Sequence, residues 1–339
     1  MSAQSSAPKF SNEFLSIGVG SRALSMSGVQ TSFVDDVTSG FWNPAGLAHL
    51  NNKYEASFMH AEYFAGIAKF DYLSFATRID TLTSVGFSAI RFGVDDIPDT
   101  RFLFDANGAI DYSQVRFFSS ADYAFLFSVG RKIPTVPGLS AGLNFKVIYR
   151  QAGSFANAWG FGLDAGVQYR RDHWNLGLTV RDVTGTYNAW NHDIDEIAPV
   201  FAQTGNEIPE NSIEITLPKA LLEVSRSFDL PKELGLLVAI GADLTFDGKR
   251  NVLIEGDAVS VDPKLGLELD YKNMFFIRSG VGNVQRIKDF DGSTDFDYQP
   301  NFGVGVVIKK VKIDYALTDI GNQAESLYSH VFTISAGFN

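Results

Sequence analysis

Residues 159–170 read WGFGLDAGVQYR, a stretch that alternates strictly between two kinds of side chain. The apolar set comprises Trp159, Phe161, Leu163, Ala165, Val167 and Tyr169. The small or polar set comprises Gly160, Gly162, Asp164, Gly166, Gln168 and Arg170. Because successive side chains of a strand point to opposite faces, this stretch predicts a β-strand with one apolar and one polar face. Aromatic residues at both ends of the apolar face are typical of a strand that spans a membrane.

The same alternation recurs after residue 53, in segments separated by turn residues. The clearest repeats are 139–150, 174–181, 265–271, 311–317 and 332–338. Less regular candidates are 54–62, 67–78, 84–92, 121–131, 215–226, 235–246, 274–282 and 301–309. The total is about fourteen strands, an even number as single-chain bacterial barrels require. We therefore predict an all-β fold, a transmembrane antiparallel barrel of about 14 strands.

Some of these segments depart from strict alternation. Ile148 is the one apolar residue on the polar face of 139–150. Segments 67–78 and 84–92 have apolar residues on both faces. These departures predict bulges, or contact with a segment inside the barrel.

The predicted connections sort by length. The short ones are 79–83, 132–138, 171–173, 227–234, 272–273 and 310, and the long ones are 93–120, 182–214, 247–264, 283–300 and 318–328. Short turns at one rim and long loops at the other are typical of bacterial outer-membrane barrels. We therefore expect periplasmic termini, extracellular long loops and an outer-membrane location. Residues 251–258 are expected to form an extended loop.

Composition limits the alternatives. The 339 residues include 29 Phe and 31 Gly but no Cys, which excludes disulfides and thiol chemistry. No run of 18 apolar residues is present, so only a barrel would satisfy every backbone polar group within lipid. The net charge of −11 argues against nucleic acid as a partner. The N-terminus lacks a basic segment followed by an apolar one, so either the protein is not exported or a signal peptide has been removed.

The segment before the strands has a different character. Residues 14–49, FLSIGVGSRALSMSGVQTSFVDDVTSGFWNPAGLAH, are rich in small side chains. Residues 21–34 predict a short helix with Ser21 as its N-cap, and residues 43–46 predict a turn. We expect an N-terminal extension at 1–13, a partly helical plug at 14–52 and the barrel at 53–339. Inward glycines of the wall would let the plug approach it closely.

Charged residues on the polar faces admit two interpretations. They are Arg150, Arg170, Arg181, Glu268, Asp270, Arg278 and Asp314. They could line a solute path, or they could neutralise one another and hold the plug in place, which we favour.

Other polar clusters indicate little chemistry. Residues 289–298 place Asp289, Asp291, Asp295 and Asp297 around Gly292, loosely like a calcium loop, but the required final Glu is missing. The five His residues lack ligand spacing, and no set of nucleophile, base and orienting residue stands out. We expect no enzyme activity, no cofactor and no metal site.

Apolar residues in the predicted long loops suggest a different role. They are Phe102, Phe104, Tyr187, Trp190, Ile194, Val200, Phe201 and Ile208. Such residues could bind a protein partner or fold over the lumen and close it.

The opening residues resemble a known family. Phe14–Ile17, Ser21–Leu24, Asp36 and Phe41–Leu47 are similar to the start of the PorV/PorQ family of Bacteroidetes outer-membrane proteins. Arg22, Asn43, Pro44, Ala45 and Gly46 form the plug motif in this resemblance. That family is related to FadL-type transporters, which share the Asn-Pro-Ala-Gly element. The resemblance extends through the strand pattern to Ser329–His330 and Phe338.

The resemblance implies a non-enzymatic component of type IX protein secretion or cell-surface attachment. Its expected partners are outer-membrane lipid and proteins, either secretion-system subunits or exported C-terminal domains. The alternative is a FadL-like transporter of hydrophobic small molecules. An outer-membrane lipase or protease is a third hypothesis, disfavoured because no catalytic set is found.

Overall fold

The computed structural model describes residues 11–101, 103, 108–195, 198, 213–288, 294–318 and 329–339. Its strands are β1 (Tyr54–Tyr63), β2 (Ala68–Arg78), β3 (Thr83–Asp99), β4 (Arg116–Lys132), β5 (Leu139–Ala152), β6 (Ala156–Arg171), β7 (Trp174–Arg181), β8 (Thr186–His192), β9 (Ile213–Thr216), β10 (Lys219–Leu230), β11 (Leu234–Thr245), β12 (Ser260–Tyr271), β13 (Phe275–Lys288), β14 (Thr294–Ile308), β15 (Val311–Thr318) and β16 (Ser329–Phe338).

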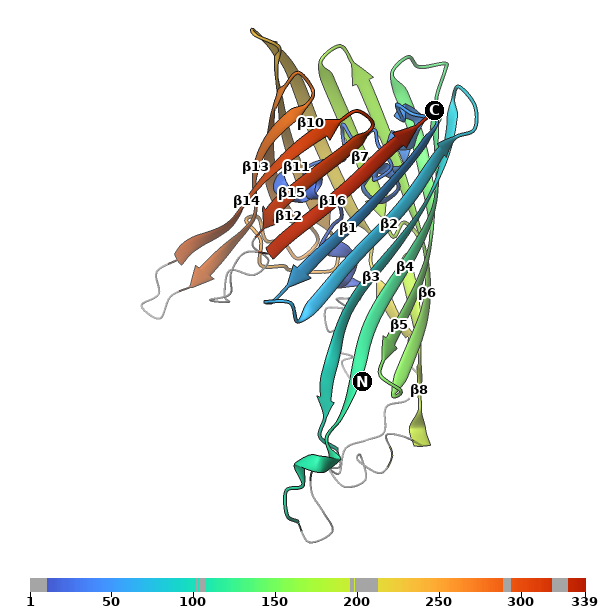
Figure 1. Cartoon of the computed structure of the whole chain (residues 1–339), viewed down its shortest axis with the longest axis vertical. Coiled ribbons are helices and arrows are strands. Elements are labelled where there is room, and N and C mark those ends of the chain that lie inside the picture. Colours follow the sequence, from blue (N-terminus) through green and yellow to red (C-terminus); the bar gives the residue numbers. More distant parts are fainter. Residues whose placement is uncertain are drawn as a thin grey trace.

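The strands form a closed antiparallel barrel (Figure 1). Its wall has fourteen positions, called staves below, each filled by one strand or by two strands in line. Strands that follow one another in sequence pair, except β7 with β8 and β9 with β10, and β1 pairs with β16 to close the wall. Strands β7 and β8 both pair with β6, so together they make one stave. Strands β9 and β10 likewise form one stave, because they pair with β8 and β7. The predicted fold and the number of strands are confirmed.

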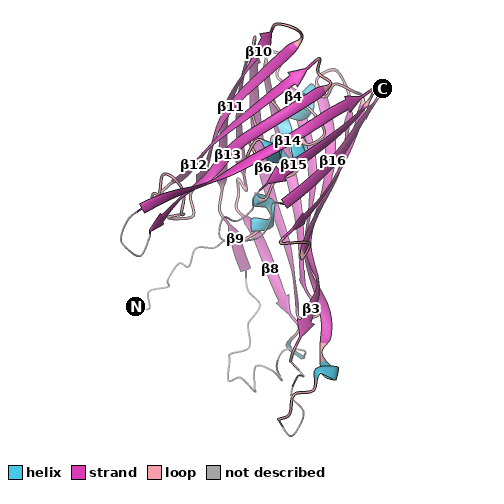
Figure 2. Cartoon of the chain, turned by 60° about the vertical axis from the view of Figure 1, so that its left-hand side comes forward, coloured by secondary structure: helices cyan, strands magenta, loops and turns pink. Residues whose placement is uncertain are grey.

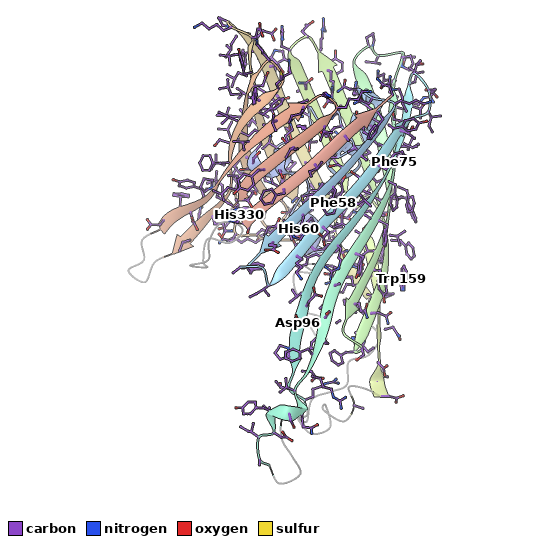
Figure 3. All side chains as sticks on the ribbon, in the orientation of Figure 1. Phe58, His60, Phe75, Asp96, Trp159 and His330 are labelled. Atoms are coloured by element: carbon purple, nitrogen blue, oxygen red, sulfur yellow. The ribbon has the colours of Figure 1, made fainter. Side chains whose placement is uncertain are left out.

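The predicted alternation is also confirmed. On β6, Trp159 and Phe161 are half exposed on the outside, whereas Asp164 and Gln168 are buried inside. Figure 3 shows Trp159, Phe58 and Phe75 pointing away from the wall. Apolar side chains on the outward face of a barrel are the surface that lipid covers.

Several boundaries differ from the prediction, because the long hairpins continue well past their neighbours. Strand β3 runs to Asp99 and β4 starts at Arg116, with a bulge between Val94 and Ile97. Strands β13 and β14 similarly extend to Lys288 and from Thr294. Both ends of the predicted loop 93–120 and most of the predicted loop 283–300 are therefore strand. Beyond the apolar belt both strand faces meet water, so the alternation that identifies a strand is lost. Residues 251–258 lie outside the strands, as expected.

Residues 11–52 lie inside the barrel and are called the hatch below (Figure 2). The hatch contains η1 (Glu13–Ser16), α1 (Ser21–Ser25), α2 (Ser39–Trp42) and η2 (Pro44–His49). Among the described residues, no helix is long and apolar enough to cross a membrane.

The predicted helix over 21–34 is too long. It ends at Ser25, because Ser27 and Gly28 adopt positive φ angles of 59° and 76° that break the helix. The predicted N-cap is also wrong: Gly20 occupies that position, and the Ser21 N–H donates to Thr333 Oγ1 at 2.9 Å. The predicted turn at 43–46 becomes the start of η2, where Asn43 Oδ1 accepts the Ala45 N–H at 3.1 Å.

Inward glycines let the hatch lie directly on the wall, as expected. A Cβ atom at Gly142 of β5 would lie 2.3 Å from the Pro44 carbonyl carbon. One at Gly280 of β13 would lie 2.4 Å from the Met26 carbonyl carbon. Both distances are shorter than any real Cβ contact, so only glycine permits this packing.

One side of the lumen is filled with apolar side chains. Strands β1–β5 contribute Met59, Phe70, Tyr72, Ile90, Leu126 and Ile148. The hatch contributes Phe14, Leu15, Val19, Leu24, Phe41 and Trp42. This cluster explains why 67–78 and 84–92 are apolar on both faces, and why Ile148 breaks the pattern of its strand.

Candidate functional site

The barrel wall is interrupted where β7 passes into β8. From Val180 to Tyr187 the chain advances seven residues, while β6 advances only four, from Ala165 to Phe161. The β7–β8 stave therefore has three residues more than β6 over this stretch, although the Val183 N–H still donates to the Leu163 carbonyl at 2.8 Å. The surplus lies within residues 182–185, between the two strands.

The neighbouring stave is interrupted at the same level. Strand β9 ends at Thr216 and β10 begins at Lys219, which leaves Leu217 and Pro218 between them. Proline has no N–H to donate to a β-ladder, so Pro218 cannot donate a ladder hydrogen bond at this point. Val183 and Leu217 are exposed on the apolar outer surface.

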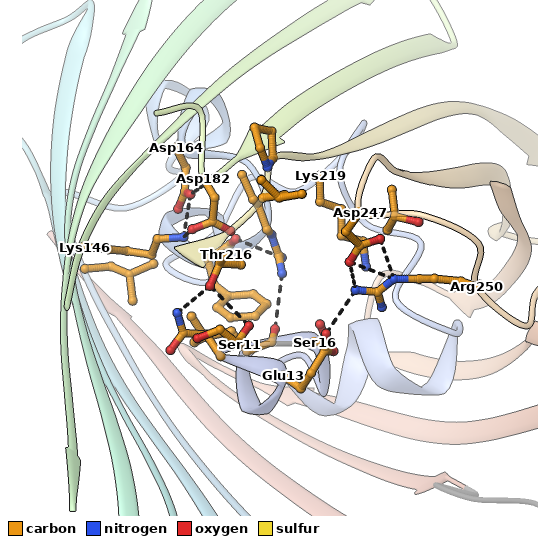
Figure 4. Close-up of a pocket in the computed structure, with 18 residues that line it drawn as sticks. Ser11, Glu13, Ser16, Lys146, Asp164, Asp182, Thr216, Lys219, Asp247 and Arg250 are labelled. Carbon is orange, nitrogen blue, oxygen red and sulfur yellow. Dashed lines mark hydrogen bonds and ion pairs between the residues drawn. The ribbon is translucent and has the colours of Figure 1, made fainter. Parts of the chain in front are cut away.

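A small cavity of about 50 Å³ lies on the inner side of this interruption (Figure 4). Its lining includes Leu217 and Pro218 from the wall and Leu15 and Phe41 from the hatch. Leu217 of the break thus lines the luminal cavity and is also exposed at the outer surface.

A buried ion cluster supports the edge of the break. Lys146 of β5 lies 2.8 Å from Asp164 of β6 and 2.6 Å from Asp182 of the interruption. Asp164 also accepts the backbone N–H of Asp182 at 2.9 Å. Figure 4 shows these three side chains converging beside Thr216. The surplus residues are therefore held in one defined conformation.

A larger cavity of about 480 Å³ opens from the small one toward the long-loop end. The two cavities share the lining residues Glu13, Ser16, Arg181, Lys219, Thr245 and Arg250. A cavity of about 150 Å³ is enough to hold benzene. The larger space is therefore big enough for a small aromatic molecule, and the smaller one is a constriction that must widen to admit it.

The plug-motif residues hold the hatch against the wall. Arg22 makes a bidentate contact with Glu268 at 2.7 and 2.8 Å. Asn43 Nδ2 donates to the carbonyls of Thr31 and Val167, both at 3.0 Å. A Cβ at Gly46 would lie 2.4 Å from the Val34 carbonyl oxygen, and Pro44 and Ala45 lie against the glycine-lined wall.

Most of the predicted lumen charges are paired. Arg278 lies 2.5 Å from Glu268 and 2.7 Å from Asp314, which joins the Arg22 pair into one buried network. Arg170 donates to the carbonyl of Val34 at 2.8 Å and lies 3.7 Å from Asp35.

The remaining three charges lie away from that network. Arg150 pairs with Asp122 at 2.8 Å near the long-loop end. Arg181 donates to the Phe41 carbonyl at 3.3 Å and stacks on its ring at 4.4 Å. Asp270 belongs to the rim, where it accepts the Asn273 N–H at 3.1 Å.

The predicted loop anchors lie elsewhere than expected. Tyr187 and Trp190 belong to β8, because part of the expected loop 182–214 forms strand. Tyr187 faces outward within the apolar belt, and Trp190 stacks with Arg150 at 5.1 Å. Phe102, Phe104 and Phe201 lie outside the described residues.

Only two of the four Asp residues of the possible calcium loop lie within the described residues. Asp295 and Asp297 lie in β14, and Asp289 and Asp291 lie outside the described residues. Within the described part of the chain, no cluster of three or more acidic or His side chains is placed to hold a metal ion.

The wall interruption is the feature that sequence analysis missed. The pattern assigned 215–226 to one continuous strand, although Pro218 lies within it. A proline inside a strand pattern is the signal that could have revealed the break.

Comparison with known proteins gives a clear result for the fold alone. No protein-family model matches the sequence, and no curated protein is detectably similar to it. Among solved structures, the toluene transporter TbuX of Ralstonia pickettii is 13% identical, with a TM-score of 0.56 over 95% of this chain and 99% of that chain.

Two further solved structures agree. The CymD monoaromatic hydrocarbon channel is 12% identical, with a TM-score of 0.58 over 95% of this chain and 98% of that one. A FadL homologue of Pseudomonas aeruginosa is 12% identical, with a TM-score of 0.50 over 94% and 97%. The chain therefore has the fold of the FadL-like transmembrane β-barrels.

Proposed function

We propose that this protein is a non-enzymatic outer-membrane channel that passes hydrophobic small molecules sideways through the interruption between β7–β8 and β9–β10. The observation that supports the proposal is the break itself, where Leu217 both lines the small luminal cavity and is exposed at the apolar outer surface. A hydrophobic solute gains free energy by entering lipid rather than water, about 25 cal/mol per Å² of apolar surface removed from water. A lateral exit would deliver the solute directly into lipid.

The similarity to hydrocarbon channels supports this proposal over the type IX role that the opening motif implies. Two of the similar barrels bear names that specify toluene or monoaromatic hydrocarbons. In the proposed orientation the termini and short turns face the periplasm, and the long loops face outward. A solute would enter at the long-loop end, occupy the larger cavity and leave through the constriction.

Removal of the surplus residues tests the lateral exit. Deleting residues 182–184 leaves four steps from Val180 to Tyr187, which matches the four steps on β6. The β9–β10 stave then keeps one surplus residue, which a simple bulge accommodates. Lys146 retains its partner Asp164 in this variant.

Toluene uptake by cells that express the protein is the measurement. We expect the deletion to lower uptake at least tenfold relative to the wild type. Asp182→Asn is the matched control, because it removes a carboxylate from the same ion cluster but keeps the break, and it should retain most of the uptake. Heat-modifiable gel migration verifies that both barrels fold. Undiminished uptake through a folded deletion variant contradicts the lateral exit.

A second candidate function is protein binding at the long-loop end, as a type IX secretion component. The supporting observation is the tip of the β3–β4 hairpin, which projects beyond the rest of the barrel (Figure 1). Tyr112 at this tip is 76% exposed, and Ile110 and Phe117 are also exposed. Exposed aromatic residues are enriched at protein interfaces.

Co-purification tests this second function. Tyr112→Ala should weaken recovery of exported C-terminal domains if the tip binds them, since truncation of a well-placed aromatic costs about 2 kcal/mol or more. Val136→Ala, on a turn at the opposite rim, is the control. Equal recovery with both variants opposes a binding role for the tip. Residues 186–204 are unsuitable for deletion, because they include β8 of the wall.

A further inference from the structure

A second large cavity lies at the short-turn end of the lumen. It has a volume of about 700 Å³, and its lining includes the turn residues Glu233, Lys272 and Asn273 together with Arg22 and Phe33 of the hatch. The cavity of about 480 Å³ described above instead reaches the loop residues Lys249 and Asn251 at the other end. Both cavities lie against strands β10–β12.

A single strap of the hatch, residues 26–32, lies between these cavities. On β12 the long-loop cavity reaches Lys264 and the short-turn cavity reaches Glu268. Between them lies Gly266, where a Cβ would meet Met26 Cβ at 3.0 Å. On β11, Asp243 and Leu237 line the two cavities, one on each side of Gly241. The strap is therefore the barrier between two open spaces.

The barrier is thin and apolar at its centre. Met26, Val29 and Phe33 of the hatch pack against Leu237 and Ala239 of β11 in one small buried cluster. This cluster is separate from the extensive apolar core on strands β1–β5. Hydrophobic constrictions can block ion passage by excluding water.

A buried carboxylate makes the most hydrogen bonds to the strap, which Ser225, Gln168 and Asn301 also contact. Glu223 of β10 accepts the N–H of Thr31 at 2.6 Å and the N–H of Ser32 at 3.0 Å. It also accepts the Ser32 hydroxyl at 2.6 Å. On β10, Glu223 pairs with Gly177 of β7 on one side and with Gly241 of β11 on the other. Glu223 therefore occupies a position where both neighbouring strands have an inward glycine. Glu223 thus holds by charge-assisted hydrogen bonds a segment that the glycines merely accommodate.

We propose that strands β10–β13 and the hatch enclose a second, axial path for small hydrated ions, which the strap 26–32 closes and Glu223 keeps closed. Charged side chains line both cavities, so a path that joins them past the strap suits small hydrated ions. The long-loop cavity has five basic and three acidic lining residues, and the short-turn cavity has three basic and five acidic ones. An ion on this path would pass one cavity with an excess of basic residues and one with an excess of acidic residues. We therefore expect an open path to discriminate little between K⁺ and Cl⁻. This proposal is independent of the lateral exit.

Conductance of the purified barrel in planar lipid bilayers, with KCl on both sides, tests the proposal. We expect Glu223→Ala to raise the conductance at least tenfold over the wild type, because it removes the acceptor of three hydrogen bonds. Val29→Gly deletes only a side chain of the apolar seal and should raise conductance without loss of the anchor. Leu222→Ala, on the exposed outer face of the same strand β10, should leave conductance unchanged.

A disulfide staple makes the test reversible. The chain contains no cysteine, and a Cβ at Gly241 would lie 3.5 Å from Val29 Cγ1, an ordinary contact distance. Val29→Cys with Gly241→Cys should therefore form a bridge with little strain. In the Glu223→Ala background we expect oxidation to restore the low conductance and reduction to raise it again.

Two results would overturn the proposal. One is unchanged conductance in both Glu223→Ala and Val29→Gly barrels that show heat-modifiable migration. The other is high conductance that persists after the staple has formed. Neither result bears on toluene uptake, so failure of the axial path is distinguishable from failure of the lateral exit.

Discussion

The two sides of the lumen hold the hatch in different ways. Along β1–β5 the hatch is fixed by close packing of apolar side chains such as Phe70, Ile90 and Phe41. Along β10–β15 it is fixed by the Arg22–Glu268–Arg278–Asp314 network and by Glu223, and the large cavities lie on that side. Apolar side chains pack closely and leave little empty space. Ion pairs and hydrogen bonds depend on direction, so a few of them can fix the hatch while cavities remain between them.

This difference indicates which parts of the hatch can move. Displacing the apolar side would expose a large hydrophobic surface at once. Displacing the strap on the polar side breaks a small apolar cluster and the hydrogen bonds to Glu223. It also breaks single hydrogen bonds to Ser225, Gln168 and Asn301. The polar side is therefore the place where the lumen can open while the hatch stays docked.

Loss of Glu268 is the change with the largest expected effect. Glu268→Ala leaves Arg22 and Arg278 without their shared carboxylate, and breaking a buried ion pair costs about 3–5 kcal/mol. We expect a corresponding loss in the free energy of unfolding, measured by urea titration of the barrel in detergent micelles. Lys272→Ala, at an exposed rim pair, is the control. A loss below about 1 kcal/mol, the scale of an exposed ion pair, would mean that the polar side is not held by this network.

Truncation of the apolar side should come next. Ile90 is fully buried between the wall and the hatch, and Ile→Ala substitutions in cores cost about 2–5 kcal/mol. Ile90→Val should cost only about 0.5–1.5 kcal/mol, which provides a graded comparison on the same measurement. Equal effects of the two substitutions would show that packing at this position does not hold the hatch.

Two inward glycines give a smaller but sharper contrast. A Cβ at Gly142 would overlap the backbone of Pro44 and Ala45, whereas one at Gly86 would lie 3.4 Å from the Leu47 side chain. Overpacking of this kind costs about 1–3 kcal/mol, so Gly142→Ala should destabilise the barrel. Gly86→Ala should be close to neutral. The measurement is the free energy of unfolding of each variant. A larger loss for Gly86→Ala than for Gly142→Ala would refute close hatch packing at Gly142.

A pH-dependent effect concerns His49 at the short-turn end. Burial, with the nearby charges of Arg170 and Lys132, lowers the pKa of His49 to about 3. The unfolded chain binds a proton at this residue near pH 6.5, and the folded chain resists protonation until about pH 3. Stability must therefore fall as pH decreases through this range.

His49→Gln removes that titration but keeps a polar side chain near Ser140, which lies 3.1 Å from His49 Nε2. We expect the variant to lose less stability than the wild type between pH 7 and pH 4. Unfolding midpoints in urea at the two pH values provide the measurement. Parallel pH profiles would show that His49 titrates normally in the folded barrel.

The sequence by itself determined the barrel and its number of strands. Alternation such as that of 159–170 depends only on which face meets lipid, so it is visible one strand at a time. The sequence also indicated contact between the wall and an inner segment, through Ile148 and through the apolar residues on both faces of 67–78. It also favoured the mutual pairing of lumen charges that Glu268, Arg278 and Asp314 display.

Only the tertiary structure decided how the lumen is divided and where the wall is broken. The break depends on a mismatch in register between β6 and the β7–β8 stave. Register is a property of two paired strands, so it cannot be read from the sequence of one strand alone. The role of Glu223 was likewise hidden, because its partners Thr31 and Ser32 are almost 200 residues away in sequence. The strap and its two cavities exist only once fourteen staves have closed around the hatch.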